Sequence, residues 1–177
     1  MIIIGIDPGL ATTGYGVISF SPPKIRSKKN RPFRCLAYGL IKTSNLVSPP
    51  ERLKTLYNDL NKLIERYRPS KMGVENIYFF RNLKTAMPVS QARGVILLTA
   101  ARKRIPVYEI TPLQVKVAIA GYGRAEKEQI KQIIKVLLDL KQVPLPDDAA
   151  DALAIAICCA SAQKPKKGLK ISYRPQK

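Results

Sequence analysis

The stretch that decides the fold is residues 2–9, Ile2-Ile3-Ile4-Gly5-Ile6-Asp7-Pro8-Gly9. A nearly continuous β-branched run is typical of a strand buried in the centre of a sheet. Asp7 is its last residue, because Pro8-Gly9 breaks the run. Residues 13–20 alternate loosely between apolar and polar and predict a second strand, joined to the first by a turn at residues 8–12. The chain therefore begins with a β-hairpin whose first strand ends in a carboxylate.

The rest of the chain alternates between strand and helix patterns. A basic, proline-rich loop at 21–32 separates the hairpin from a third strand at 33–41. The later patterns predict a helix at 51–67, a strand at 72–75, a helix at 83–104 that Pro88 must start or kink, a strand at 106–110, and helices at 112–120, 125–140 and 148–162. This order predicts an α/β domain over residues 1–162, with a mixed five-stranded sheet flanked by helices. We expect residues 163–177 to be a basic, flexible tail.

The charge of the chain points to nucleic acid. Its 177 residues include 31 Lys and Arg but only 12 Asp and Glu, for a net charge of +19 and an isoelectric point of about 10.1. Self-repulsion at this charge costs stability, so solubility alone does not account for it. A ribosomal or membrane-surface role is the alternative. No apolar run approaches the roughly 20 residues of a membrane span, and Met1 leads directly into a strand, so we expect a cytoplasmic protein.

Four carboxylates stand out against this basic background. Asp7 and Glu75 each end a predicted strand, and Asp148 and Asp151 share one face of an alanine-rich helix. If the two strands are neighbours, their carboxyl ends meet at one edge of the sheet, and the helix can bring its acids to the same place. Each acid alone also has an ordinary explanation, as a turn residue, a helix cap or a surface ion-pair partner.

The composition of this cluster indicates a metal site. The chain contains no histidine, so a general base must be a carboxylate, a lysine or metal-bound water. Oxygen ligands without nitrogen or sulfur suit magnesium or manganese. Two such ions about 3.5–4 Å apart can activate water and stabilise the leaving oxygen of a phosphodiester. A carboxylate metal site in a polycation therefore predicts a nuclease.

Several segments resemble the RuvC family of Holliday-junction resolvases, in the same order along residues 1–160. They are Gly5-Ile6-Asp7-Pro8-Gly9 with Thr13-Gly14-Tyr15-Gly16, then Gln91-Ala92-Arg93-Gly94, Gln114-Val115-Lys116, Ala125-Glu126-Lys127 and residues 148–154. The resemblance implies an RNase H-like fold and a homodimer that makes magnesium-dependent cuts in two opposed strands of four-way junction DNA, with a branch-migration helicase complex as a further partner. It places the catalytic, metal-binding acids at Asp7, Glu75, Asp148 and Asp151. The chain carries Asp147 beside Asp148, and we expect Asp147 to cap the helix or lie outside the ligand set.

DNA-contacting residues are predicted on both sides of this cluster. Aromatic side chains beside an active site can stack on unpaired bases or wedge between them. The alternative is that one or two of the rings at 78–80, Phe80 among them, fill the core instead, and the lysines matched by the resemblance could otherwise be ordinary solvated residues. The predicted contacts are Tyr78, Phe79, Arg81, Lys84, Lys116, Arg124 and Lys127.

The helix at 83–104 is apolar on more than one face, which fits packing on the sheet and against a second subunit. A fully buried core helix is the other interpretation. A two-fold dimer also suits two paired cuts. For the whole chain, the competing functions are a non-catalytic DNA-binding module, an ATP-handling protein of the actin-like kind, and a related nuclease that acts on RNA.

Overall fold

The sheet is mixed and five-stranded, with the order β3-β2-β1-β4-β5. This computed structural model describes residues 1–22, 31–76, 83–140 and 144–161, without the side chains of 83–85 and 161. β1 pairs antiparallel with β2 and parallel with β4, which pairs parallel with β5. The strands are β1 (Ile2–Asp7), β2 (Thr12–Phe20), β3 (Phe33–Lys42), β4 (Lys71–Glu75) and β5 (Val107–Ile110).

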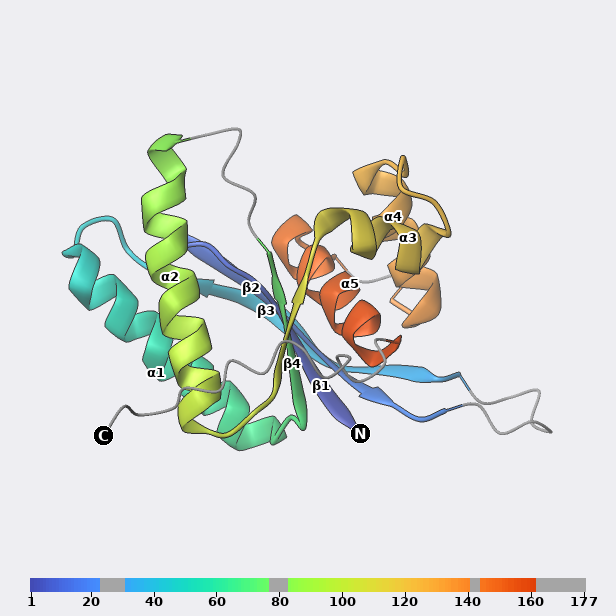
Figure 1. The fold of residues 1–177 in the computed structure, drawn as a ribbon, viewed down its shortest axis with the longest axis horizontal. Helices are drawn as coiled ribbons and strands as arrows, with labels where there is room; N and C mark the ends of the chain where they lie inside the picture. The colour runs from blue at the N-terminus through green and yellow to red at the C-terminus, as the bar shows by residue number, and fades with distance from the viewer. Residues whose placement is uncertain (23–30, 77–82, 141–143, 162–177) are drawn as a thin grey trace, which may run out of the picture.

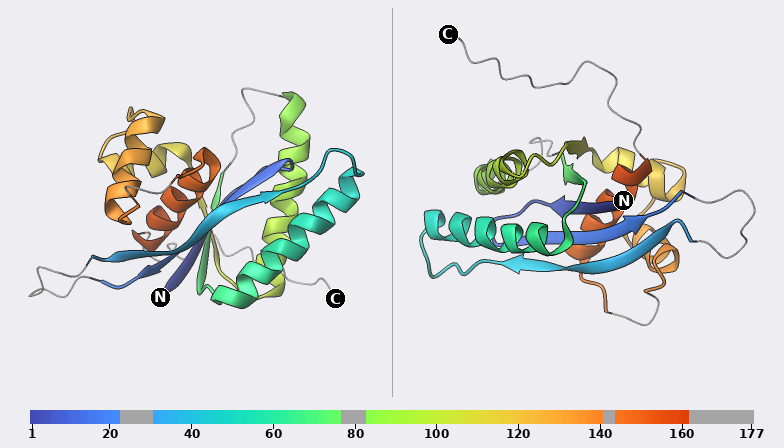
Figure 2. Two further views of the ribbon diagram at one scale, coloured as in Figure 1. Left: turned by 180° about the vertical axis from the view of Figure 1, so that it is seen from behind. Right: turned by 90° about the horizontal axis from the view of Figure 1, so that it is seen from below.

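Five helices cover the two faces of the sheet. In Figure 1, α1 and α2 lie on one side of the sheet and α3, α4 and α5 on the other, and the two views of Figure 2 agree. Within the described ranges, no helix combines the length and apolar character that a membrane span needs. The helices are α1 (Pro49–Tyr67), α2 (Leu83–Arg102), α3 (Pro112–Ala120), α4 (Lys127–Leu137) and α5 (Asp147–Ser161).

The element order is as predicted, but several helix boundaries differ, among them the end of α2 at Arg102 and the start of α5 at Asp147. α1 begins at Pro49 rather than after the two prolines, because proline is well tolerated in a first helical turn. α4 is shorter than 125–140 at both ends: Glu126 is extended with φ −77° and ψ 156°, and Asp139 takes a left-handed φ of 60° beyond the last turn. Pro88 lies inside α2, so of the two alternatives for it, a helix start or a kink, the helix start is excluded.

The alternation along β1 separates two cores. Ile4 and Ile6 pack in a cluster with residues of α1 and α2, whereas Ile3 belongs to the cluster around α5. Gly5 lies on the α5 side as well, because a Cβ there would meet the α5 backbone. Side chains alternate along a strand, so Asp7 also faces α5.

α5 lies unusually close to the sheet. Glycines at Gly5, Gly14, Gly16 and Gly73 face it, and a Cβ on Gly16 would lie 2.8 Å from the Cα of Leu153. On α5, Ala152 and Ala156 meet Gly5, and the other alanines of the helix, Ala149, Ala150 and Ala154, are buried as well. This close packing sets the position of the acids at the start of α5 relative to the ends of β1 and β4.

Candidate active site

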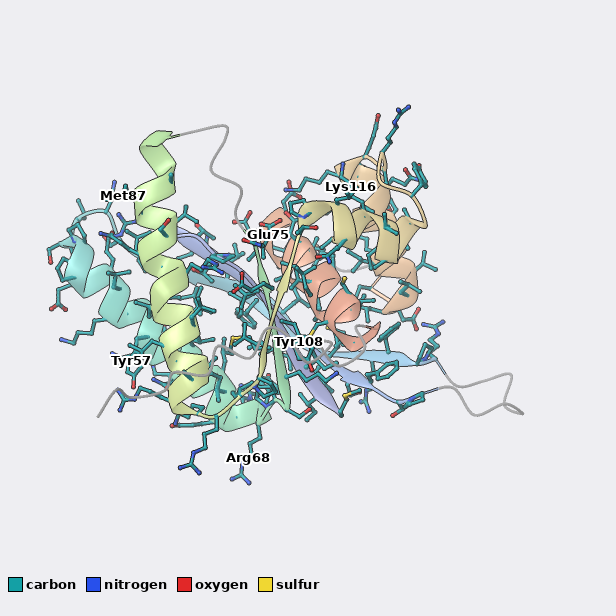
Figure 3. The ribbon with its side chains drawn as sticks, in the orientation of Figure 1. Tyr57, Arg68, Glu75, Met87, Tyr108 and Lys116 are labelled. Atoms are coloured by element: carbon teal, nitrogen blue, oxygen red, sulfur yellow. The ribbon has the colours of Figure 1, made fainter. Side chains whose placement is uncertain are left out.

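Asp7 and Glu75 meet at one edge of the sheet. β1 and β4 run parallel with Ile6 opposite Val74, and the next residue on each strand is the acid. The two carboxyl groups share a hydrogen bond. Figure 3 shows Glu75 at the end of β4, beside the beginning of α5. The sheet therefore presents two carboxyl groups together where the sequence predicted them.

The helix α5 adds two further acids. One carboxylate oxygen each from Asp7, Asp148 and Asp151 lie within 4.8 Å of one another. Asp147 is outside this set: its Oδ1 accepts a hydrogen bond from Lys131 Nζ at 2.6 Å on the neighbouring helix. The neighbouring aspartates thus point to different partners, and Asp148 rather than Asp147 joins the cluster.

Burial and mutual repulsion raise the pKa values of the acids at the strand ends. Burial is the main cause that raises the pKa of Asp7 to about 8, followed by the charges of Glu75 and Asp151, the hydrogen bond with Glu75, and the charge of Asp148. Burial also raises the pKa of Glu75, although the hydrogen bond from Asp7 and the charge of Lys127 act in the opposite direction. The cluster thus favours a positive charge, either a proton on Asp7 or a cation.

This donor set fits a divalent metal ion. The clustered ligand atoms are all carboxylate oxygens, which hard cations prefer. Burial and the neighbouring carboxylates keep a proton on Asp7, and a divalent ion would supply the positive charge in place of that proton. The structure therefore brings three of the four predicted acids, Asp7, Asp148 and Asp151, within reach of one ion, and it places the fourth, Glu75, beside Asp7 at the strand end.

Two of the predicted lysines border the cluster. Lys127 Nζ lies 2.9 Å from Asp151 Oδ2. Lys116 on α3 lines a cavity of about 160 Å³ together with Glu75, Lys127 and Asp151, and Figure 3 shows it near the end of β4. Arg124 is exposed in the segment between α3 and α4. These positions put basic groups at the border of the acidic cluster.

The predicted aromatic contacts cannot be placed in the same way. Tyr78, Phe79, Phe80 and Arg81 lie outside the described residues, and so does the side chain of Lys84.

The ladder between β4 and β5 extends one residue past Glu75, since Asn76 N donates to Ile110 O at 2.8 Å.

Besides the pair Lys127–Asp151, the sequence interpretation missed two further ion pairs between elements. Arg93 joins α2 to β5 through Glu109 at 2.6 Å. Lys131 joins α4 to α5 through Asp147. A signal for the second pair is present in the sequence, since Lys127 and Lys131 are four residues apart, as are Asp147 and Asp151. Two lysines and two aspartates at the same helical spacing suggest that the two helices face each other and that their charges pair.

A mixed sheet of this order, with carboxyl groups from β1, β4 and α5 at one edge, defines an RNase H-like nuclease. The family model for crossover junction endodeoxyribonuclease RuvC matches residues 3–159. The chain belongs to this family. The predictions of family, fold class and enzyme class are confirmed.

Curated relatives support the same assignment over nearly the full length. A crossover junction endodeoxyribonuclease RuvC of Alkaliphilus metalliredigens is 51% identical over 160 residues, which cover 90% of this chain and 93% of the relative. The RuvC of Pelotomaculum thermopropionicum is 47% identical over 171 residues, covering 97% of this chain and 99% of the relative.

Solved structures agree. The chain is similar to T. thermophilus RuvC in complex with Holliday junction substrate, with a TM-score of 0.79, 35% identity, and coverage of 89% of this chain and 92% of that one. The yeast mitochondrial Holliday junction resolvase Ydc2 shares the fold at a TM-score of 0.61 and 15% identity, with coverage of 89% and 78%.

Proposed function

We propose that this chain cuts two opposed strands of four-way DNA junctions, during recombination and repair, and that Asp7, Glu75, Asp148 and Asp151 are its catalytic, metal-binding acids. The observation that carries the proposal is the meeting of the acids of β1, β4 and α5 at one edge of the sheet in a chain of net charge +19. The acids alone would repel the phosphates of DNA. Bound cations would offset this repulsion and let the substrate approach the acids.

The metal is the first element of this proposal. We propose two magnesium ions per site, with manganese as a substitute, because the donors are carboxylate oxygens. When bound, such ions supply an activated water and stabilise the leaving oxygen. The chain contributes the ligands and their rigid spacing, which the contact between α5 and the sheet maintains.

Basic side chains hold the DNA against this edge. Lys116 and Lys127 border the acids and are positioned to contact phosphates next to the cut. Arg124 adds a further phosphate contact from an exposed segment. Tyr78, Phe79, Arg81 and Lys84 are proposed contacts on the basis of the sequence alone.

A homodimer provides the second cut, and α2 is its proposed interface. On the outer face of α2, Met87 and Leu98 have 70% and 56% of their surface exposed; Met87 lies toward the upper end of α2 in Figure 3. Exposed Gln91 and Gly94 complete a row at spacings of four, three and four residues. A Cβ on Gly94 would meet nothing within 4 Å, so a second helix could approach closely there. The alternative of a core helix buried on all sides is therefore wrong for α2.

Family membership supports the remaining parts of the proposal. We propose residues 1–162 as the nuclease domain and 163–177 as an appended basic segment. A branch-migration helicase complex is the proposed partner that supplies the junction. Because the proposed substrate is bacterial DNA, we propose that the enzyme works in the cytoplasm.

The test is cleavage of a synthetic four-way junction with each strand labelled in turn. We expect paired nicks in two opposed strands with magnesium, no product with EDTA, and binding without product for Asp7→Asn. Binding without cutting by the wild-type protein would favour a non-catalytic DNA-binding module. Near wild-type cutting by Asp7→Asn would contradict the assignment of the site.

A further inference from the structure

Two parallel ion pairs join α4 to α5. Lys127 pairs with Asp151 at 2.9 Å, and one turn further along α4 Lys131 pairs with Asp147 at 2.6 Å. The two lysines are on the same helix and both partners are aspartates. They differ in one respect: Asp151 belongs to the acidic cluster, and Asp147 does not.

The ammonium group of Lys127 is therefore already inside the proposed metal site. It lies on Oδ2 of Asp151, and its charge also acts on Glu75. Lys116 lines the same cavity, but over the described part of the chain it makes no ion pair or side-chain hydrogen bond. The two lysines that border the site are thus in different situations, one held by a carboxylate and the other free of such a contact.

We propose that Lys127 is a displaceable counter-ion: it neutralises Asp151 while the site holds no metal, and metal binding at Asp151 releases its ammonium group to a phosphate of the junction. The inference rests on the metal binding in the proposed function. It makes Lys127 a positioning residue that links metal occupancy to DNA contact, whereas Lys116 is available to DNA in both states.

Electrostatics and mobility support this exchange. A divalent ion and an ammonium group on one carboxylate repel each other, and this repulsion grows as their separation decreases. Lys127 can move away without disturbing the fold, because 58% of its side-chain surface is exposed and its stem is flexible. A phosphate of the bound junction would then offer the released ammonium group a new negative partner.

The first test measures metal binding in the absence of DNA. Titration calorimetry with Mn²⁺ should give an affinity about threefold to tenfold tighter for Lys127→Met than for the wild type, because the metal no longer competes with an ammonium group. Lys131→Met is the matched control: it removes the same charge from the same helix, and its affinity should stay at the wild-type value. Equal or weaker binding by Lys127→Met would overturn the proposal, since a lysine that merely supports the site would not oppose the metal.

The second test measures junction binding in Ca²⁺ and in EDTA. Lys127→Met should lose affinity relative to the wild type in Ca²⁺ but not in EDTA, whereas Lys116→Met should lose it in both. An equal loss for Lys127→Met in both buffers would also overturn the proposal. Lys127→Gln replaces Lys127→Met if melting in EDTA shows the latter to be unfolded. A wild-type protein that binds no metal at all would instead contradict the proposed function, so the two failures are distinguishable.

Discussion

Gly5 of β1 and Ala152 of α5 are in backbone contact, since a Cβ on Gly5 would overlap the carbonyl oxygen of Ala152. We therefore expect Gly5→Ala to destabilise the protein by about 2–4 kcal/mol, because the helix must move off the sheet to accept one methyl group. Urea denaturation followed by circular dichroism would measure the change.

Gly94→Ala is the control for this prediction. A Cβ at Gly94 meets nothing within 4 Å, and the residue lies in the middle of α2. The folded monomer, measured at concentrations below dimer formation, should gain up to about 1 kcal/mol from the better helix propensity of alanine. Equal destabilisation by Gly5→Ala and Gly94→Ala would show that the close contact between β1 and α5 does not make an added methyl group destabilising.

The raised pKa of Asp7 predicts a pH dependence of stability without metal. Its pKa is about 8 in the folded protein against an ordinary value of 3.8, so the folded state keeps a proton that the unfolded state releases. This contribution is fully present below about pH 4 and is lost as the pH rises toward 8. In EDTA at pH 8, Asp7→Asn should therefore be more stable than the wild type by a few kcal/mol, since one pKa unit corresponds to about 1.4 kcal/mol.

Thermal melts of both proteins at pH 5 and pH 8 would check this. The advantage of Asp7→Asn should grow with pH, and magnesium should stabilise the wild type at pH 8 more than the variant. Parallel stability curves for the two proteins would rule out Asp7 as the group that titrates.

The neighbouring aspartates of α5 should respond differently to the same substitution. Asp148 joins Asp7 and Asp151, whereas Asp147 pairs with Lys131 near the surface. We expect Asp148→Asn to lower the rate of junction cleavage at least about 100-fold, because it removes a proposed metal ligand. Asp147→Asn should stay within about threefold of the wild type, since an exposed ion pair contributes little. Single-turnover cleavage rates would decide, and the reverse ranking would place the metal on Asp147.

The outer face of α2 predicts the effect of a charge on dimer formation. Leu98→Lys should weaken the dimer at least about tenfold, because it places a charge on the apolar part of the proposed interface. Analytical ultracentrifugation over a range of concentrations would measure the dissociation constant. Val136→Lys is the matched control, since Val136 on α4 is similarly exposed at 55% but lies away from α2. A dimer unaffected by Leu98→Lys would move the interface to another surface.

The strands and the acidic cluster were predictable because their signals are local. The apolar run before Asp7 and the pattern of aspartates and alanines from Asp148 to Asp151 identify a central strand and a close-packed helix, and neighbouring strands then bring Glu75 to the same edge. Helix ends were less predictable. Glu126 is a good helix former, yet its backbone is extended and α4 begins at the next residue.

Side-chain partners were the least predictable part of the site. The pairing of Lys127 with Asp151 depends on how α4 crosses α5, and the crossing angle of two helices is set by the packing of their whole faces rather than by a local pattern. Arg93 could be matched to a family motif, but its partner Glu109 was not foreseen because this pairing depends on how α2 packs on strand β5.

The acids and the lysines of the proposed site differ in how rigidly they are held. The acids are anchored on backbones that touch, so the distance from Asp7 to the start of α5 cannot stretch without separating helix from sheet. Lys116 of α3 and Lys127 of α4 reach the acids through longer side chains, and their helices lie outside the close contact between α5 and the sheet. We therefore expect the lysine side chains to adapt to junctions of different shape, while the acids keep fixed positions.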